Sequence, residues 1–415
     1  MQPYLSNRGR SYVKEMPPLM EAHFRIADQL YHPVQRPDGY INMGTAENHL
    51  MDSAMASLIS KIQCSMPVTS AQMHYDYSYG TRELRTAIAD YWQKYVLTGK
   101  NAPKVTADNI IVTAGCSVAL EFLATMLGDV GDVFLVPTPF YSGFLDDVSG
   151  RVGLEIVGVD AGPSLDPAAF EAALSQQRAL GKKVVGVLYS SPNNPVGTLY
   201  TPEQIQGIID FCSRNHLELI SDELYAQTVH DPADKFVSAF ELAPKEFLPH
   251  LHVTGSFSKD FALSGFRTGF LITFHEEMLQ GMHVLSYYAN VSNHTQAILA
   301  QLLRSEELPQ LLKDGRALLK HNCTYMRNAL ADIGIKSAPS QSGFFLFSDF
   351  SPFMETKDKN GELVLWDKLF NELKINITPG FVFSSPRPGF FRICSAHPME
   401  YISEACRRLS HLQPV

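Results

Sequence analysis

Residues 251–267 read LHVTGSFSKDFALSGFR and begin with an apolar run that is typical of a buried β-strand. The run ends among small hydroxyl residues that flank Lys259, and Arg267 follows further along the same segment. A solvated loop lysine is the simplest interpretation of an isolated Ser-x-Ser-Lys sequence. The rest of the chain decides whether Lys259 belongs to a loop or to a binding site.

Short β-branched runs alternate with amphipathic segments between residues 105 and 275, as in parallel strands that are joined by crossover helices. These runs are NIIVTAG, DVFLVPTP, LEIVGVD, KVVGVLYSSP, LELISDE, LHVTGSFS and TGFLITF. They predict an α/β fold with one large, mostly parallel, seven-stranded sheet. Four polar residues lie at or just after the ends of runs: Ser117, Asn194, Asp222 and Lys259. Because ligands of open α/β sheets bind at the carboxyl ends of the strands, we expect these side chains to share one crevice.

The length of 415 residues exceeds the size at which one hydrophobic core usually stops growing, so two domains are expected. Beyond residue 310 a long polar helical pattern leads to the runs FFLFSDF and FFRICSAH, which indicate a smaller α+β domain. We expect residues 1–65 to form an N-terminal arm and part of this small domain. The large domain is predicted at residues 66–305, and the small C-terminal domain at residues 306–415.

Composition argues against several classes of protein. Lys and Arg total 34 against 43 Asp and Glu, and a formal charge of −9 argues against a nucleic-acid partner. The six cysteines contain no Cys-x-x-Cys pair, so reduced thiols are expected rather than a disulfide framework or a metal site. The N-terminus lacks the apolar stretch of a signal peptide, and no run of 18 apolar residues occurs. We therefore expect a cytoplasmic protein without a membrane partner.

The stretch TAGCSVALEF predicts a strand that ends at Gly115 and a helix that opens near Ser117. Free backbone N–H groups and the helix dipole make such a turn a candidate phosphate site, although an ordinary capped turn explains it equally well. The stretch SFSKDFALSGFR adds Ser256, Ser258 and Arg267, and an arginine can bind phosphate oxygens in a bidentate way.

The stretch SDELYAQ places Asp222 at a strand end, with Tyr225 three residues later. A buried carboxylate needs a cationic partner, and a protonated heterocyclic nitrogen would serve. The alternative is an aspartate that caps the next helix. In YSSPNNPVGT, prolines bracket Asn193 and Asn194, which fits a rigid site or simply a tight turn.

In this order and spacing, SPNNPVG, SDELY, SFSKDFALSGFR and GFFRICSAH resemble the fold-type I pyridoxal 5′-phosphate (PLP) enzymes of the class I and II aminotransferase group. The stretches INMGTAENHL, VPTPFYSGFLDD and ITPGFVFSSPRPGFFRICSAH are most similar to 1-aminocyclopropane-1-carboxylate (ACC) synthases and their relatives. The resemblance covers the chain from about residue 40 to its end. It implies a PLP-binding large domain and a homodimer with shared active sites.

The resemblance implies a role for each candidate residue. Lys259 would form the Schiff base with PLP, and Asp222 would pair with the pyridinium nitrogen. Tyr225 and Asn194 would bind the phenolic oxygen of the ring, and Tyr141 would stack on its face. The implied phosphate site consists of Gly115, Cys116, Ser117, Ser256, Ser258 and Arg267.

The implied substrate site includes Arg392, which would bind the α-carboxylate, and Ala46 and Glu47, with Asn194 beside them. The Glu47 carboxylate suits a cationic sulfonium, but an exposed glutamate at a helix start is the simpler alternative. The family usually carries a tyrosine that reaches the partner subunit's cofactor, and its position here falls on Ser78. Tyr77 or Tyr79 could take this place if the loop shifts by one residue.

Three functions remain open. In the resembled enzymes the freed lysine removes the Cα proton to give a quinonoid, from which the reaction branches. One hypothesis is an ACC synthase-like lyase that expels a sulfur leaving group from S-adenosylmethionine or a related amino acid. The second is an aminotransferase in specialised metabolism, and the third is a non-catalytic scaffold.

Other polar and aromatic residues allow two interpretations. Tyr287, Tyr288 and His294 fit either a pocket for a bulky polar substrate or a dimer interface. His49 and His397 are suggestive of a site, but histidines of this kind are more often structural.

Overall fold

The large domain is an α/β structure built on one seven-stranded sheet, in a computed structural model that describes residues 4–13, 16, 18–231 and 233–415. In spatial order the strands are β2 (Ile110–Thr113), β8 (Gly269–Thr273), β7 (Leu251–Ser256), β6 (Glu218–Asp222), β5 (Val184–Ser190), β3 (Val133–Pro137) and β4 (Glu155–Val159). Strand β8 runs antiparallel to β2 and β7, and the other neighbours are parallel. The predicted mostly parallel seven-stranded sheet is confirmed, and each predicted run forms one strand.

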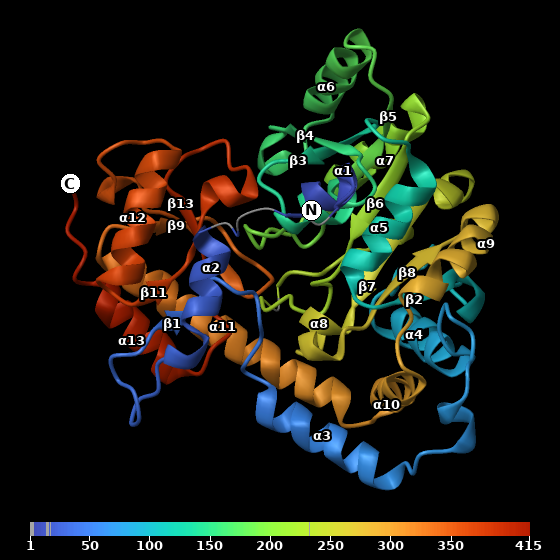
Figure 1. Ribbon diagram of the computed structural model, residues 1–415, viewed down its shortest axis with the longest axis horizontal. Helices are drawn as coiled ribbons and strands as arrows, with labels where there is room; N and C mark the ends of the chain where they lie inside the picture. The colour runs from blue at the N-terminus through green and yellow to red at the C-terminus, as the bar shows by residue number, and fades with distance from the viewer. Residues whose placement is uncertain (1–3, 14–15, 17, 232) are drawn as a thin grey trace.

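Helices cover both faces of this sheet (Figure 1). Those that contact its strands are α4 (Arg82–Tyr95), α5 (Cys116–Leu127), α6 (Pro167–Ala179), α7 (Pro202–Asn215) and α9 (Glu276–Leu285), whereas the short α8 (Phe257–Asp260) follows β7 and α10 (Asn293–Arg304) packs on α4. Alternate strand residues belong to different cores: Leu135 packs in the core that includes α4, α6 and α7, and Phe134 in the core that includes α5 and α9. Both faces are therefore buried, which explains the continuous apolar runs.

Helix α7 begins where its sequence predicts. Thr201 accepts a hydrogen bond from the Gln204 main-chain N–H at 3.3 Å, and the Gln204 side chain accepts one from Thr201 N at 2.9 Å. Pro202 occupies the first helical position, where its missing N–H is not needed. The capping box is confirmed, and Ile205 and Ile209 on the inner face are buried.

The C-terminal segment forms a second layered unit. One sheet orders β12 (Thr378–Pro379), β13 (Phe390–Cys394), β10 (Phe345–Asp349) and β9 (Lys336–Ser337), and a second pairs β1 (Ile41–Asn42) with β11 (Ile375–Asn376). The remaining helices are α1 (Asn7–Ser11), α2 (Pro18–Arg25), α3 (Asp52–Ser65), α11 (Leu308–Asp332), α12 (Lys359–Asn371) and α13 (Met399–Leu409). Ile26 and Ile41 share one core with Phe345 and Trp366, so N-terminal residues pack inside the C-terminal unit.

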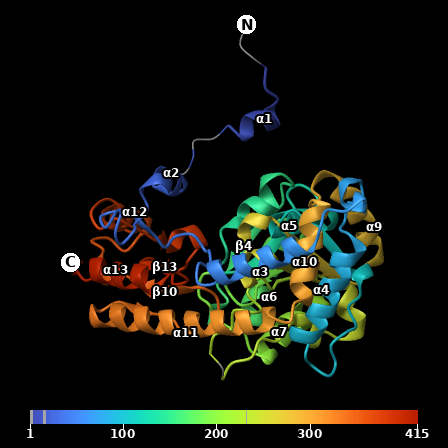
Figure 2. The same ribbon diagram turned by 90° about the horizontal axis from the view of Figure 1, so that it is seen from below.

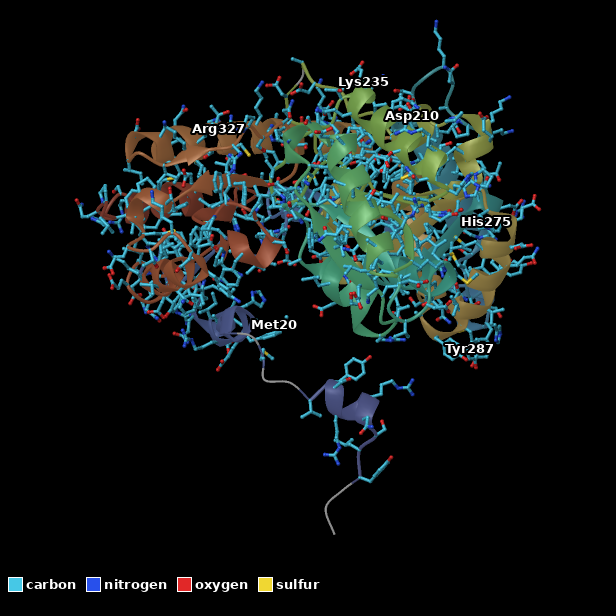
Figure 3. The ribbon with its side chains drawn as sticks, turned by 90° about the horizontal axis from the view of Figure 1, so that it is seen from above. Met20, Asp210, Lys235, His275, Tyr287 and Arg327 are labelled. Atoms are coloured by element: carbon cyan, nitrogen blue, oxygen red, sulfur yellow. The ribbon has the colours of Figure 1, made fainter. Side chains whose placement is uncertain are left out.

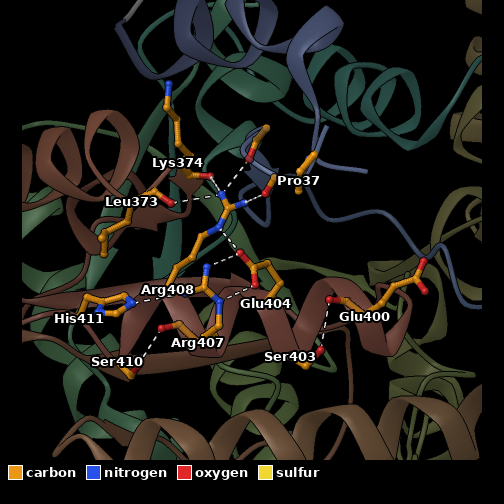
Figure 4. Close-up of polar contacts among 11 residues, drawn as sticks. Pro37, Leu373, Lys374, Glu400, Ser403, Glu404, Arg407, Arg408, Ser410 and His411 are labelled. Carbon is orange, nitrogen blue, oxygen red and sulfur yellow. Dashed lines mark hydrogen bonds and ion pairs between the residues drawn. The ribbon is translucent and has the colours of Figure 1, made fainter. Parts of the chain in front are cut away.

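Arg408 fastens the N-terminal segment to this unit (Figure 4). Its guanidinium donates to the main-chain oxygens of Pro37 and Gly39 at 2.8 and 2.7 Å, and to that of Leu373 at 3.3 Å. Glu404 accepts from Arg408 Nε at 2.8 Å, which holds the side chain in place. Segments far apart in sequence are thus joined through one buried cation.

Helix α11 lies across both parts of the molecule (Figure 2). Leu308 and Leu312 pack in the large core, whereas Leu319 and Met326 pack in the C-terminal core. Helix α3 lies beside α10 and adds Met55 to the large core. At the end of α1, the Tyr12 hydroxyl donates to the main-chain oxygen of Gly150 at 3.1 Å. Within the part of the chain that the structure describes, no helix combines the length and the apolar character that crossing a bilayer requires.

Candidate active site

A cavity lies where the carboxyl ends of β5, β6 and β7 approach the start of α5. Its lining includes most of the predicted cofactor residues. The lining residues are Cys116, Ser117, Leu120, Tyr141, Asp147, Asn194, Asp222, Leu224, Tyr225, Ser256, Ser258, Lys259, Ser264 and Arg267. The polar side chains that follow separate strands in the sequence thus share one crevice in the structure.

The start of α5 and two hydroxyl residues form one side of this cavity. Gly115 precedes the helix with φ +93°, and a Cβ at this position would lie 2.6 Å from Arg267 Nη2. A glycine is therefore needed both for the backbone conformation and for the close approach of the guanidinium. Ser256 Oγ accepts from the Ser258 main-chain N–H and donates to Ser258 Oγ, both at 2.9 Å. Hydroxyls, a cation and a helix N-terminus together suit a phosphate.

Asp222 ends β6 and is buried at the base of the cavity. Its Oδ1 accepts from Thr254 Oγ1 at 3.0 Å and from Cys116 Sγ at 3.9 Å. Burial raises the pKa of Asp222 to about 7, and the nearby Asp147 carboxyl acts in the same direction. No cationic side chain within the described ranges forms an ion pair with this carboxyl. A ligand cation at this point would relieve the unfavourable burial of a charge.

Lys259 lies in α8, directly after β7, and its amine is mostly shielded from water. Burial lowers the pKa of Lys259 to about 8, and the neighbouring Arg392 guanidinium contributes to the shift. The Nζ atom donates to the main-chain oxygen of Ala46 at 2.6 Å. An amine with a lowered pKa is a nucleophile and base near neutral pH, which an exposed lysine is not.

Arg392 and Glu47 do not line the cavity themselves, but each contacts a residue that does. Arg392, in β13, donates to Asn194 Oδ1 at 3.0 Å and to the Gly44 main-chain oxygen at 2.5 Å. Its Nε has no hydrogen-bond partner among the described residues, so the guanidinium keeps a free donor. Glu47 Oε1 accepts from Ser264 Oγ at 2.8 Å, and Ser264 itself lines the cavity. The Arg392 guanidinium could therefore bind the carboxylate of a substrate.

Two tyrosines among the predicted cofactor residues, Tyr225 and Tyr141, line the cavity. Tyr225 packs edge-on against Phe344 and Phe345, with ring centroids 5.3 Å from each. Burial raises the pKa of Tyr225 well above its usual value and that of Tyr141 to about 12. Both phenols therefore stay protonated and can donate hydrogen bonds at neutral pH.

Sequence reasoning missed Asp147, the second aspartate of the stretch PTPFYSGFLDD. It lies in the irregular helix η4 (Leu145–Gly150) and lines the cavity. Burial raises its pKa to about 6, and its Oδ2 atom is buried without a hydrogen-bond partner in the parts of the chain described. The only signal in the sequence was its nearness to Tyr141, because the local helix that turns it inward follows no regular period.

The loop residues predicted to meet the partner subunit lie elsewhere. Tyr79 stacks on His283 with centroids 3.7 Å apart, and Ser78 Oγ donates to the His283 main-chain oxygen at 3.3 Å. Tyr77 is exposed. In the part of the chain that the structure describes, Tyr77, Ser78 and Tyr79 do not line the cavity of their own chain. Their contact with a second subunit stays a prediction.

The residues present fit PLP on chemical grounds. A buried carboxyl without a cation faces the cavity at Asp222, which suits a protonated ring nitrogen. The Arg267 cluster at the start of α5 suits a phosphate, and Lys259 carries an amine with a lowered pKa for an aldehyde. The three groups line one cavity, as a single small cofactor requires.

Comparisons with known proteins agree with this geometry. Residues 40–409 match the family described as aminotransferase class I and II. The 1-aminocyclopropane-1-carboxylate synthase 6 of Oryza sativa subsp. japonica is 30% identical, covering 98% of this chain and 79% of the rice protein. A probable aminotransferase of Arabidopsis thaliana is 32% identical, covering 89% of this chain and 77% of the relative.

The fold is similar to that of solved aminotransferases. A double mutant of Thermus thermophilus aspartate aminotransferase superposes with a TM-score of 0.81 at 20% identity, covering 99% of this chain and 100% of the other. The aromatic aminotransferase of Pyrococcus horikoshii gives a TM-score of 0.75 at 21% identity, with 94% and 97% coverage. On these grounds the chain belongs to the class I and II aminotransferase family and is a PLP-dependent enzyme of lyase or aminotransferase type.

Proposed function

We propose that the protein is an ACC synthase-like lyase that acts at Cα of an L-amino acid and eliminates a sulfur leaving group. S-adenosylmethionine or a related sulfur amino acid is the substrate. The observation that carries this proposal is the Glu47 carboxylate, which accepts at 2.8 Å from the hydroxyl of Ser264, a residue that lines the cavity. A fixed negative charge beside the cavity favours a substrate that carries a positive charge, such as a sulfonium.

Arg392 binds and orients the substrate. Its guanidinium lies over the rings of Phe345 and Phe383 at 5.3 and 4.7 Å, which fixes its plane. Its bonds to Asn194 and Gly44 hold two nitrogens, and the remaining donors can bind an α-carboxylate.

Lys259 moves the proton. Bound PLP supplies an electron sink that acidifies the Cα hydrogen. The Lys259 amine, with its pKa lowered to about 8, accepts that proton at Nζ. Asp222 supports the step because its carboxylate keeps a cationic ring nitrogen protonated. Tyr225 excludes water from this side, since it is buried against Phe344 and Phe345.

Product analysis tests the proposal. The PLP-loaded protein is incubated with labelled S-adenosylmethionine, once without and once with a 2-oxo acid. The lyase hypothesis predicts release of a thioether product without an amino acceptor. Turnover that produces a 2-oxo acid and depends strictly on the amino acceptor would contradict it.

A matched variant tests the role of Glu47. E47Q keeps the hydrogen bond to Ser264 and removes the charge. We expect affinity for S-adenosylmethionine to fall roughly tenfold, while affinity for neutral S-adenosylhomocysteine stays within about twofold. Equal losses for both compounds would show that Glu47 has only a structural role.

A second candidate function is an aminotransferase that uses the same lysine and cofactor. The observation that favours it is the similarity to a probable aminotransferase of Arabidopsis thaliana at 32% identity. Ser78, at the position of the tyrosine that the family usually carries, departs from the pattern for either function. The same product analysis separates the two functions.

A homodimer is also part of the proposal. Exposed aromatic side chains that a partner could cover include Tyr77, Tyr287 and Tyr288. Figure 3 shows Tyr287 at the molecular surface, on the opposite side from Arg327 of α11. Sedimentation velocity of the PLP-loaded protein is expected to give a dimer mass, and an active monomer would contradict shared active sites.

A further inference from the structure

A second cavity lies where α11 passes the loop after β6. Its volume is about 570 Å³, which suits a small organic ligand. The walls come from the end of α4 and the turn after it, from residues 226–231 and 234–236, and from the first half of α11. Among the described residues, the linings of this cavity and of the active cavity have no member in common. A ligand here would therefore occupy a site separate from the active one.

Positive charge collects around this cavity, although the whole chain has a formal charge of −9. Four cationic side chains line it, against the two carboxylates of Asp231 and Asp234. Asp231 already pairs with Lys320 at 3.4 Å, and Asp234 Oδ1 accepts from the Gln341 side chain at 3.4 Å. The other three cations of the lining form no ion pair within the described ranges: Lys235, Lys313 and Arg316. This local excess of positive charge favours an anionic ligand.

His230 adds a buried polar group to the lining. It is only 7% exposed, and its Nε2 atom has no hydrogen-bond partner in the parts of the chain that the structure describes. Burial lowers the pKa of His230 to about 4, and the Arg327 guanidinium acts in the same direction, so the ring is neutral near pH 7. With its proton on Nε2, the ring can donate one hydrogen bond. A ligand oxygen would satisfy this otherwise costly buried group.

Apolar side chains complete the lining. They are Tyr95, Val96, Ala226, Val229, Phe236 and Ala317. An inorganic ion would leave this surface in contact with water, whereas an organic body would cover it. The site therefore matches an organic anion whose charged end meets the cations and whose apolar body meets these side chains. Three unpaired cations favour a doubly charged head, such as that of a phosphate monoester, over a single carboxylate.

One peptide segment connects this cavity to the active site. Arg316 Nη1 donates to the Gln227 main-chain oxygen at 3.3 Å, and Gln227 N donates to Asp260 Oδ1 at 3.0 Å. Asp260 directly follows Lys259 in α8. Tyr225 lies two residues before Gln227. Because an anion on Arg316 competes with the Gln227 oxygen for the same guanidinium, its binding would alter a segment that contacts the active-site residues.

The cavity lies away from the aromatic side chains assigned above to a dimer interface. Figure 3 shows Lys235, which lines the cavity, at the molecular surface on the same side as Arg327 and opposite Tyr287. Lys313 is exposed as well. A dimer formed through the face of Tyr287 would therefore leave this cavity accessible to a dissolved ligand.

We propose that this cavity is an effector site, which binds a small organic phosphate monoester away from the active site and changes the environment of Lys259. The unpaired cations bind the phosphate oxygens, the His230 ring donates to one of them, and the apolar side chains cover the organic body. The inference does not depend on whether the enzyme is a lyase or an aminotransferase.

The test uses phenyl phosphate and the PLP-loaded protein, in which the cofactor already fills its own phosphate site. Calorimetry is expected to show saturable binding at least tenfold tighter than that of inorganic phosphate, because the phenyl ring adds apolar contact. K313Q is expected to weaken binding about threefold through loss of a charge, and H230F about tenfold through loss of a buried donor. K368Q is the matched control, because Lys368 is an exposed lysine of α12 outside this lining, and it is expected to change the affinity less than about twofold.

The visible absorbance of bound PLP reports the coupling to Lys259. Saturating phenyl phosphate is expected to shift the pH midpoint of this absorbance by roughly one unit in the wild type. R316Q removes the guanidinium that the two acceptors share and is expected to abolish the shift.

Three results would overturn the inference: no binding of phenyl phosphate, equal losses in K313Q and K368Q, or binding without a shift of the midpoint. Urea unfolding shows whether each variant is folded. If H230F is not folded, K313Q still decides the outcome, because Lys313 is exposed and its replacement leaves the core unchanged.

Discussion

The two sides of the active cavity are built in different ways. The cofactor floor, defined as Asp222, Tyr225, Ser256, Ser258 and Lys259, comes from the ends of two adjacent strands and the turns that follow them. Its hydrogen bonds are local to the sheet, such as Thr254 Oγ1 to Asp222 at 3.0 Å. One sheet therefore determines the geometry of the whole floor.

The substrate wall, defined as residues 44–49 and 392–397, is assembled from opposite ends of the chain. Arg392 bonds to Gly44 and to Asn194, and Glu47 bonds to Ser264. The Glu47 side chain is 43% exposed, whereas Asp222 is buried. From this difference we propose that the floor holds the cofactor and that the wall influences the choice of substrate.

The largest effect is expected on the floor. D222N keeps the shape of the side chain but removes the charge that would hold a ring nitrogen protonated. We expect kcat/KM to fall roughly 10³-fold, as for loss of one partner of a buried charge pair. Steady-state kinetics with saturating PLP measures this change. A loss below tenfold would show that Asp222 does not face the ring nitrogen.

A smaller effect, of a different kind, is expected on the wall. R392K keeps the positive charge but loses the planar fork, so kcat/KM is expected to fall about 10²-fold, mainly through KM. PLP affinity, followed by visible absorbance, is expected to stay unchanged. A parallel loss of PLP affinity would break the distinction between floor and wall.

The cofactor-free protein offers a pH test of the same distinction. Asp222 has a folded pKa of about 7, above its usual value, so the folded state holds its proton while the unfolded state has lost it. The free energy of unfolding is therefore expected to fall as pH rises from about 4 to about 7. Asp147 and Glu223, whose pKa values burial raises to about 6 and about 8, add to this slope.

D222N removes one contribution to that slope. We expect the cofactor-free variant to be more stable than the wild type at pH 7.5 by on the order of 2 kcal/mol, and to lose this advantage at pH 4. Urea unfolding at the two pH values measures the difference. Identical slopes for the two proteins would mean that Asp222 is ionised in the folded protein without its cofactor.

The smallest effect is expected far from both regions. T201A removes the hydroxyl that accepts from Gln204 N at the start of α7. The free energy of unfolding is expected to fall by about 1 kcal/mol, with no change in PLP affinity or KM. Thermal unfolding and a PLP titration check both parts, and a change in KM would show that α7 influences the cavity.

Sequence reasoning predicts, for a physical reason, that the floor residues lie together in one cavity. Asp222 and Lys259 directly follow buried apolar runs, and parallel strands bring their carboxyl ends to one edge. Local patterns could not reveal that β8 runs antiparallel to its neighbours, because a continuous apolar run carries no direction.

The wall and its surroundings were harder to predict. Asp147 enters the cavity through an irregular helix, which has no simple period in the sequence. His397 Nε2 is buried without a hydrogen-bond partner among the described residues, and this depends on packing between segments that are hundreds of residues apart. The interface expected for Tyr77 depends on a second chain, which one sequence does not place.

The most direct test of the account is covalent trapping of the cofactor. The protein is mixed with PLP, reduced with sodium borohydride, digested and analysed by mass spectrometry. We predict one modified peptide with PLP fixed to Nζ of Lys259, and no modification at this peptide in K259A. Absence of labelling at Lys259 under conditions that label another lysine would contradict the central claim.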